Sequence, residues 1–339
     1  MKRVVVLGAT GTLGLPICRH LKEKGYEVIA VGHNGAGREL FQSLGIASTA
    51  IDITRKEDFD LLPQENVECV IQFAGALPAM MKEENDNTMY PDTIICGVIH
   101  TLDYMRKIGC RKLIFPQSVY DLHHLFGTPE PISPDAERVN PLEGDHSIYV
   151  ICKNAALDVI SYYENTYGIK GIILRLPGVY QYHPKPFILI NGTMRVKSER
   201  ILIHKAQKGE TLEIWGDPKR VLESVCVEDF LQIVEKCVSS ETARGIYNVG
   251  NGGSTLEERI LGIREVFCTK DHISDIVYRP EKKDCTQYLL DIEKTKRELG
   301  YVPQYTWTDY LKKLKWHMEN QPNRSVWGAF EDYYHLLER

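Results

Sequence analysis

The sequence predicts an α/β protein built on a doubly wound parallel sheet, and three observations lead to that prediction. Short runs of β-branched residues alternate with stretches of helical periodicity through the first half of the chain. A glycine-rich turn directly follows the first of these runs. Beyond residue 177 the alternation stops, and proline, aromatic and polar residues become frequent. We therefore expect a sheet covered by helices, followed by a smaller, discontinuous α/β domain.

The expected strands of the main sheet are short and apolar on both faces, as parallel strands covered by helices are. They lie in "RVVVLGA", "EVIAVG", "VECVIQFAG", "KLIFPQS" and "GIKGIILRLPGVY". "SVCVEDFLQIVEKCV" is expected to return to this sheet as a strand and a helix, and "GIYNVGN" as a further strand. The first domain is thus expected to comprise residues 1–177 and about 225–250. The second is expected to comprise about 178–224 and 251–339.

Composition excludes several classes of function. The chain has 339 residues, 43% of them hydrophobic and 26% charged, as in a globular protein, and its net charge of −5 argues against nucleic acid or an anionic membrane as partner. No apolar stretch is long enough to span a bilayer, and the N-terminal apolar run is too short for a signal peptide. The nine cysteines include no C-x-x-C pair, which favours reduced thiols and a cytoplasmic location. Histidine and cysteine spacing indicates no metal site.

The glycine-rich turn in "VVVLGATGTLG" predicts a dinucleotide site. Gly8, Gly11 and Gly14 follow the first strand and open the first helix, in a G-x-x-G-x-x-G variant of the dinucleotide fingerprint. Gly8 would allow a tight turn, Gly11 a close approach to a pyrophosphate, and Gly14 close packing of helix on strand. The amides at the helix N-terminus would face the phosphates. We therefore expect a Rossmann-type domain that binds NAD or NADP.

The end of the second strand bears on the choice of cofactor. An acidic residue there usually binds the adenosine ribose, and here its place is taken by Gly32. His33, Asn34 and Arg38 follow. Without a carboxylate to repel a 2′-phosphate, Arg38 or His33 could pair with one, which favours NADP. The alternative is that Arg38 only solvates the start of a helix.

Tyr149 and Lys153 lie one helical turn apart in "SIYVICKNAALDVI", an apolar-periodic stretch at residues 147–160. Spacing alone does not separate a catalytic pair from two polar residues on a solvated helix face.

With the glycine turn, the Tyr-x-x-x-Lys pair and the β/α order together, nearly the whole chain resembles the extended short-chain dehydrogenases/reductases. These are the NAD-dependent sugar epimerases and dehydratases. "DIT" resembles the family's adenine-contacting turn, "QFAGA" the strand end beside the nicotinamide ribose, and "LRLPGVY" the segment flanking the nicotinamide. The cofactor-binding residues that the resemblance implies are Gly8, Thr10, Gly11, Thr12, Leu13, Gly14, His33, Asn34, Arg38, Asp52, Ile53, Phe73, Ala74, Gly75, Tyr149, Lys153 and Pro177.

The resemblance also implies the catalytic residues Tyr149, Lys153 and Ser118. A phenol with a reference pKa near 10 is a poor base at neutral pH, and a nearby ammonium would favour its anion. Tyr149 would then exchange a proton with a substrate hydroxyl, and Ser118 would hold that oxygen. In "LIFPQSVYD", alignment from the strand places Ser118 at the family's Ser/Thr position, whereas alignment from Val119 places Pro116 there, which cannot serve. The alternative is that Ser118 only caps the following turn.

The expected substrate is a sugar, and in particular a nucleotide sugar, although this chain departs from the family's phosphate-gripping motif. The motif's Arg falls on Leu222 and its Asp on Glu223. Arg220 and Arg279 are candidate replacements, and His183 is a candidate substrate contact or a plain loop residue. "PQS" replaces the Thr-Asp-Glu of the dehydratases, which disfavours 4,6-dehydration. A plain NADPH-dependent ketoreductase and a non-catalytic, NAD(P)-sensing relative are the alternatives.

A homodimer is expected, because the family tends to dimerise through the Tyr149 helix and the helix before it. An exposed apolar ridge of Ile151, Ala155 and Ala156 would suit that contact. The tail "WHMENQPNRSVWGAFEDYYHLLER" is expected to pack on the second domain or on a partner subunit, with closure of the substrate site as the alternative.

Overall fold

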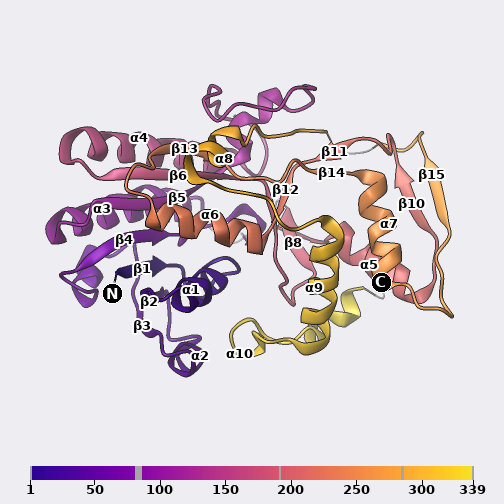
Figure 1. Cartoon of the computed structure of the whole chain (residues 1–339), viewed down its shortest axis with the longest axis horizontal. Helices are drawn as coiled ribbons and strands as arrows, with labels where there is room; N and C mark the ends of the chain where they lie inside the picture. The colour runs from indigo at the N-terminus through magenta and orange to yellow at the C-terminus, as the bar shows by residue number, and fades with distance from the viewer. Residues whose placement is uncertain (1, 81–85, 191, 284–285, 338–339) are drawn as a thin grey trace.

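Seven parallel strands form the main sheet of the protein (Figure 1). The computed structural model describes residues 2–80, 86–190, 192–283 and 286–337. The strand order is β13-β6-β5-β4-β1-β2-β3, and every neighbouring pair is parallel. The strands are β1 (Arg3–Leu7), β2 (Glu27–Gly32), β3 (Ala47–Ala50), β4 (Val67–Gln72), β5 (Lys112–Ser118), β6 (Lys170–Leu176) and β13 (Gly245–Asn248). This confirms the predicted doubly wound sheet.

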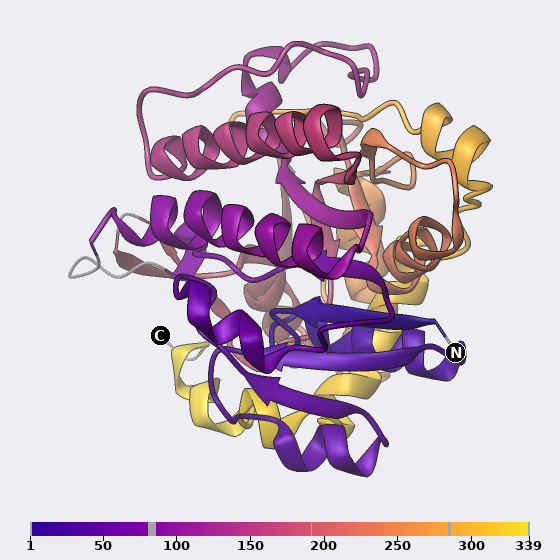
Figure 2. The same ribbon diagram turned by 90° about the vertical axis from the view of Figure 1, so that its left-hand side faces the viewer.

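Helices cover both faces of the main sheet. On one face α1 and α6 pack in a core that also holds parts of α2 and α8, and on the other face lie α3 and α4. Figure 2 shows α3 and α4 side by side over the sheet. Strand β1, in the interior of the sheet, is buried on both faces, which explains its unbroken apolar sequence. The helices are α1 (Gly14–Glu23), α2 (Arg38–Ser43), α3 (Gly97–Ile108), α4 (Ser147–Tyr167), α6 (Val227–Ser239) and α8 (Glu293–Leu299).

Short segments of other helical types connect the strands and helices. They include the 3₁₀ turns η1 (Lys56–Leu61), η2 (Pro78–Met80), η4 (Val119–Leu125) and η5 (Glu331–Leu336). A π-helical segment, η3 (Pro91–Cys96), leads directly into α3. π-Helical turns are found preferentially at functional sites, and η3 packs against α4, the helix that carries Tyr149.

Small two-stranded sheets and three helices form an outer region with a core of its own (Figure 1). Its sheets pair β8 with β9, β10 with β15, and β11 with β14. Thr255 and Thr306 begin two of its helices with capping boxes, in which the threonine and an acidic residue three positions later satisfy each other's backbone amides. The elements are β8 (Phe187–Ile190), β9 (Thr193–Val196), α5 (Ser198–Lys208), β10 (Leu212–Trp215), β11 (Val221–Leu222), β14 (Ser254–Thr255), α7 (Leu256–Phe267), β15 (Ile276–Arg279) and α9 (Trp307–Asn320).

The strand β12 (Ser224–Cys226) does not return to the main sheet, so that prediction is wrong. It pairs in parallel with β7 (Gly178–Tyr180), which follows β6 after Pro177. The reason is that β13 already occupies the free edge of β6, pairing along Ile172–Arg175. The helix that follows, α6, does cover the main sheet as expected.

The long helix α4 presents a narrower apolar surface than the sequence suggested. Ala156 is fully buried against the sheet, so it is not part of an exposed ridge. Ile151 and Ala155 are half-buried. Ile148 and Tyr162, at 40% and 55% exposure, extend the same apolar stripe toward both ends of the helix.

The chain beyond α9 lies across two parts of the molecule. The short helix α10 (Arg324–Trp327) lies beside α1 and α2 (Figure 1), whereas Tyr333 and Tyr334 approach the rings of Phe187 and His204 in the outer region. The expected packing on the second domain is thus confirmed, and the contact with the first helices is an addition to it.

The described residues were compared with the predictions about membrane spans, metal sites and disulfides. Within the ranges given above, no helix is long and apolar enough to cross a bilayer. In the same ranges, no group of three or more His, Cys, Asp or Glu side chains could hold a metal ion. The eight cysteines that fall there are all free thiols.

Candidate active site

The strand order reverses direction at β1, which places a crevice at the carboxyl ends of β1 and β4. The chain runs from β1 to β2 and β3 on one side, and to β4, β5 and β6 on the other. Ligands of doubly wound sheets bind at such a switch point. The turns predicted to bind a dinucleotide follow β1, β2 and β4, so they all meet at this crevice.

The glycine turn after β1 leaves no room for side chains. Gly8 has φ +88°, and a Cβ there would lie 2.6 Å from the amide nitrogen of Ala74. A Cβ on Gly14 would lie 2.0 Å from the Gly8 carbonyl oxygen. Both distances are far below a van der Waals contact, so neither position has room for a side chain. The Gly11 amide donates to the Gly8 carbonyl at 3.0 Å, and Leu13 is the N-cap of α1.

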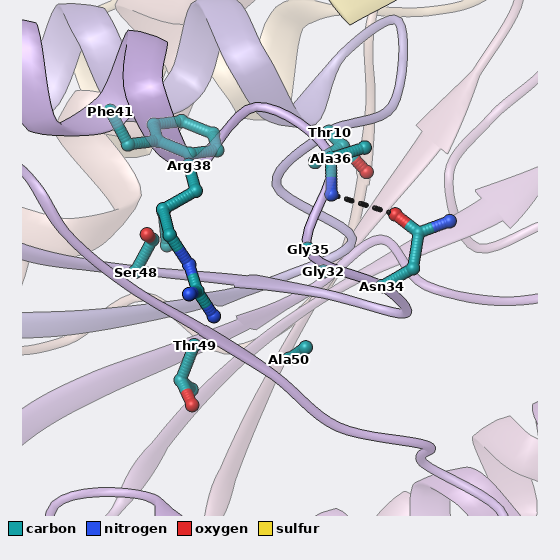
Figure 3. A pocket seen from close by; sticks show the side chains of 11 residues that line it. Thr10, Gly32, Asn34, Gly35, Ala36, Arg38, Phe41, Ser48, Thr49 and Ala50 are labelled. Carbon is teal, nitrogen blue, oxygen red and sulfur yellow. Dashed lines mark hydrogen bonds between the residues drawn. The ribbon is translucent and has the colours of Figure 1, made fainter.

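A hollow lies at the end of β2, where an acidic residue is missing (Figure 3). Gly32 is the last residue of this strand. The Arg38 side chain reaches toward Thr49 and has no hydrogen bond or ion pair with any described residue (Figure 3). Asn34 accepts a hydrogen bond from the Ala36 amide at 3.0 Å, which shapes the turn. Residues lining the hollow include Thr10, Gly32, Asn34, Gly35, Ala36, Arg38, Ser48, Thr49 and Ala50.

Asp52 and Ile53 follow β3 beside this hollow. The Asp52 carboxylate accepts hydrogen bonds from the amide and the hydroxyl of Thr54, at 2.9 and 2.8 Å. Burial raises the pKa of Asp52, but these bonds outweigh it, and with the nearby His33 they hold the pKa below its usual value. The Ile53 side chain is 8% exposed and lies against Gly97 of α3.

The segment after β4 is tied to β1. The amides of Phe73 and Ala74 both donate to the Leu7 carbonyl, at 2.9 and 3.1 Å. These bonds bring Phe73, Ala74 and Gly75 to the glycine turn, as the resemblance implied. Gln72, the last residue of β4, is fully buried, and its amide group has no partner among the described residues.

Tyr149 and Lys153 are both buried, so they are not a pair on a solvated surface. Tyr149 is 8% and Lys153 5% exposed. The Lys153 ammonium donates to the Pro116 carbonyl at 2.8 Å, and its Nζ lies 5.8 Å from the centre of the Tyr149 ring. Burial lowers the pKa of Lys153 to about 7 and raises the pKa of Tyr149 above its usual value. The tyrosine ring packs edge-on against Tyr90, at 6.2 Å between ring centres.

Ser118 lies at the carboxyl end of β5, where alignment from the strand places it. It is the last residue of the strand and pairs with Leu176, whereas Pro116 lies inside the strand. Its hydroxyl accepts a hydrogen bond from the Tyr120 amide at 3.2 Å and so caps η4. The capping that was considered as an alternative is therefore present, and it fixes the hydroxyl at the strand end.

A buried polar network that the sequence analysis missed lies beneath Ser118. Arg175 on β6 and Asp121 in η4 are fully buried and form an ion pair at 3.1 Å. Gln117 donates to Asp121 and to Asn154 of α4, at 3.1 and 2.8 Å, and its oxygen accepts from the Ser118 amide at 2.9 Å. Burial raises the pKa of Asp121, and Arg175 opposes that shift. An arginine inside the apolar strand "GIILRL" was the signal that could have revealed this network, because a charge buried there needs a partner.

The candidate substrate residues Arg220, Arg279 and His183 lie in three different segments of the chain. Arg220 is 7% exposed in the turn before β11. Arg279, at the end of β15, forms an ion pair with Glu213 at 3.1 Å. His183 lies in the segment between β7 and β8, and its ring stacks on Trp327 with 5.3 Å between ring centres. Burial lowers the pKa of His183 to about 4, so its ring is neutral at physiological pH.

Two buried charged residues, Glu223 and Arg259, form hydrogen bonds with backbone groups where β12 meets the outer region. Glu223 accepts from the amides of Ser224, Asn251 and Leu290, at 3.1 to 3.2 Å, so its role is structural. Arg259 of α7 donates to the Leu222 carbonyl at 2.6 Å. No local sequence signal distinguishes Arg259 from a surface arginine.

The residues of the crevice fit a dinucleotide. The glycine turn forms a cradle that a Cβ would fill, and it leads directly into the N-terminus of α1, whose positive dipole end favours phosphate. The hollow at β2 and the turn at Asp52 offer polar groups at one end of this cradle. At the other end, Lys153 and Tyr149 of α4 lie beside the neighbouring strand β5, whose Pro116 carbonyl accepts from Lys153. Fold and crevice together define a dinucleotide-binding protein of the Rossmann type.

Comparison with known proteins identifies the family. The model of the NAD dependent epimerase/dehydratase family matches residues 4–250, and the chain belongs to that family. A relative is the putative UDP-glucose 4-epimerase of Methanocaldococcus jannaschii, 26% identical over 94% of this chain and 98% of its own length.

Solved structures of similar fold include both epimerases and dehydratases. The UDP-N-acetylglucosamine 4-epimerase of Bacillus cereus has a TM-score of 0.72 at 16% identity, covering 94% of this chain and 97% of that one. The dTDP-glucose 4,6-dehydratase of Bacillus anthracis, solved in complex with NAD, has a TM-score of 0.71 at 18% identity, covering 99% and 100%. At these identities the likeness concerns the fold.

Proposed function

We propose that the protein is an epimerase that inverts a hydroxyl-bearing carbon of a nucleotide sugar. The observation that carries this proposal is the buried Tyr149 and Lys153 pair beside the carboxyl end of β5, next to the glycine cradle. Support for the substrate class comes from relatives whose names specify nucleotide-sugar epimerases and dehydratases.

Each catalytic residue has a separate task in this proposal. Tyr149 takes a proton from the substrate hydroxyl and later returns it. Lys153 holds the cofactor's ribose, and its charge favours the phenolate of Tyr149, against the effect of burial on both groups. Ser118 donates to the substrate oxygen from its fixed place at the strand end. The chemistry that a bound nicotinamide supplies is reversible hydride transfer, and inversion requires that the oxidised sugar carbon be reduced from its other face.

Epimerisation is favoured over 4,6-dehydration by the residues beneath Ser118. Dehydration needs an acid and a base beside the strand end in addition to the tyrosine. Here Gln117 stands there, and its amide is engaged with Asp121 and Asn154. An amide cannot exchange protons as a carboxyl does.

The test is turnover of purified protein on a panel of UDP- and dTDP-sugars. An epimerase produces the isomeric nucleotide sugar with no net change in NAD(P)H. Stoichiometric oxidation of NADPH with a ketone would instead establish the ketoreductase alternative.

Replacing Tyr149 by Phe separates an enzyme from a cofactor-sensing protein. We expect Tyr149→Phe to lower the rate by about 10²- to 10⁴-fold, the usual contribution of a positioned acid or base. Cofactor affinity, measured by fluorescence titration, should change little. Tyr162→Phe, on the exposed side of the same helix, serves as the control. Cofactor binding without turnover in the unaltered protein would favour the sensor, and unchanged turnover in Tyr149→Phe would exclude Tyr149 as the acid and base.

The hollow at β2 supports NADP as the preferred cofactor within this NAD dependent family. It contains no carboxylate, and the Arg38 guanidinium is available for a 2′-phosphate beside the Ser48 and Thr49 hydroxyls (Figure 3). We expect NADP to bind about tenfold more tightly than NAD, because a charge-assisted hydrogen bond contributes about 1.5 kcal/mol or more. Arg38→Ala should remove most of this difference, and Arg297→Ala, at an exposed arginine of α8, should not. Calorimetric affinities for both cofactors check this, and equal affinities in the unaltered protein would contradict it.

The organisation of the chain completes the proposal. A cofactor domain of residues 1–177 and about 225–250 would carry the hydride chemistry, and about 178–224 with 251–339 would bind the sugar nucleotide. The apolar stripe on α4 supports a homodimer. The free thiols of the described residues support a cytoplasmic location.

A further inference from the structure

The indole of Trp327 is hydrogen-bonded to the glycine turn. Its Nε1–H donates to the Thr10 carbonyl at 3.0 Å, although the two residues are 317 positions apart in the sequence. Trp327 is 7% exposed and belongs to the core beneath α1 and α6. A buried indole N–H requires an acceptor, and a backbone carbonyl of the glycine turn meets that requirement here.

Together with a second hydrogen bond, this bond fixes the orientation of the peptide plane between Thr10 and Gly11. The plane between Thr10 and Gly11 is held at its N–H by the Gly8 carbonyl and at its C=O by Trp327. Because a peptide unit is rigid, two opposed hydrogen bonds fix its orientation. Thr12 and Leu13 follow it and lead into α1, whose Leu15 amide donates to the Gly11 carbonyl at 3.1 Å. The direction in which the amides of Thr12, Leu13 and Gly14 point therefore depends on the plane that Trp327 holds.

The C-terminal segment, residues 321–336, touches the cofactor crevice at a second place. A methyl group of Val326 lies 3.4 Å from the position of a Cβ on Gly37, in the turn before Arg38. The segment therefore contacts both turns that border the adenosine half of a dinucleotide. In Figure 1 and Figure 2 the C-terminal segment lies beside the first helices of the chain.

The same segment is anchored in the outer region on its other side. The His183 ring stacks on the face of Trp327, and the His183 carbonyl accepts from Arg200 of α5 at 3.1 Å. Tyr333 approaches Phe187 of β8, with 5.9 Å between ring centres. Trp327 is thus fixed by contacts with the outer region while its N–H reaches the glycine turn.

We propose that Trp327 is a positioning residue for the dinucleotide: the C-terminal segment holds the glycine turn in its phosphate-binding conformation through the Trp327–Thr10 hydrogen bond. Cofactor affinity then depends on a residue that lies outside the part of the chain matched by the family model. This inference rests on dinucleotide binding and not on the sugar that the enzyme converts.

The test is Trp327→Phe, which keeps an aromatic ring in the core and removes the N–H. We expect the dissociation constant for NAD or NADP to rise about 3- to 10-fold, as loss of one hydrogen bond predicts. ADP, used as a probe that carries only the adenosine and the two phosphates, should weaken by the same factor. Trp316→Phe, at a tryptophan of α9 that is 52% exposed, is the matched control and should bind like the unaltered protein.

Hydrogen–deuterium exchange of the cofactor-free protein distinguishes positioning from a general loss of stability. Peptides covering residues 8–17 should exchange faster in Trp327→Phe, while peptides of β5 and β6 should not. The proposal is overturned if the affinities for both ADP and the dinucleotide stay within twofold. It is equally overturned if exchange in the glycine turn is unchanged, or if Trp316→Phe weakens binding as much. If Trp327→Phe does not fold, His183→Ala, which removes the stacking partner, gives the same two readouts with the same criteria.

Discussion

Lys153 shows how burial governs the chemistry of a single side chain. The ammonium is 5% exposed, donates to a carbonyl and lies 4.2 Å from the centre of the Phe115 ring. Burial lowers its pKa to about 7, whereas the ordinary value is 10.5. A lysine in this state changes its charge near neutral pH, where the tyrosine one turn away needs a cation.

Stability is expected to reveal this shift. Between pH 7 and 10.5 the unfolded chain binds more protons at Lys153 than the folded one, so the free energy of unfolding rises with pH in this window. Compared with Lys153→Met, the unaltered protein should gain stability from pH 7 to 9, with a slope of at most about 1.4 kcal/mol per pH unit. Urea unfolding at several pH values measures it, with Lys170→Met, at an exposed lysine, as control. Parallel curves for the unaltered and Lys153→Met proteins would contradict the shift.

Residues with a local motif were predictable, and those defined by distant contacts were not. Gly8, Gly14, Tyr149 and Lys153 come with fixed spacing inside a strand-turn-helix or on one helix face, and the structure places them as expected. Trp327 had no such signal, because its partner is 317 positions away. Ala156 was wrongly predicted to be exposed, because the sequence of a helix with a wide apolar stripe does not show which side of the stripe packs against the core.

At the scale of elements, α4 combines two surfaces with different tasks. One face buries Tyr149, Lys153 and Ala156 against the sheet and its neighbours. The opposite face carries a stripe of apolar residues at helical spacing, with Ile148 and Tyr162 the most exposed. α3 lies alongside α4, so the two helices form one continuous layer (Figure 2). A second copy of the same layer would cover this stripe.

The dimer can be tested on this stripe. We expect Ile151→Glu to weaken self-association about 30-fold or more, since a buried unpaired charge costs about 2 kcal/mol at the centre of an interface. Sedimentation at micromolar concentration measures it. Ile201→Glu, on the exposed side of α5 in the outer region, is the matched control. A monomeric mass for the unaltered protein would contradict the dimer itself.

Most strands of the main sheet were predictable because their sequences are locally consistent, but β3 was not predicted, since "ASTA" is not an apolar run. Apolar β-branched runs bounded by glycine specify buried strands, and all of the runs in the first 176 residues became strands of that sheet. The partner of β12 was not predictable in the same way. "SVC" reads as a strand, but whether it pairs with β6 or with β7 depends on which segment already fills the edge of β6.

At the scale of the whole molecule, the cofactor crevice is assembled from both ends of the chain. The glycine turn comes from the first residues, and the segment that braces it comes from the last. The outer region lies between them in sequence and anchors the brace through His183. The two regions were predictable from the sequence but this connection was not, since fold class follows from local patterns whereas the docking of a tail depends on completed surfaces.

The position of β13 has a consequence for synthesis of the chain. Gly245–Asn248 fill the edge of β6, and they emerge from the ribosome about seventy residues after it. Until then the growing polypeptide carries a row of unpaired backbone groups along Ile172–Arg175, beside apolar surface that α6 has not yet covered. A fragment that ends near residue 177 would keep this edge open permanently. Residues 1–177 therefore make a poor stand-alone unit, and recombinant versions of the cofactor domain need the chain through residue 250.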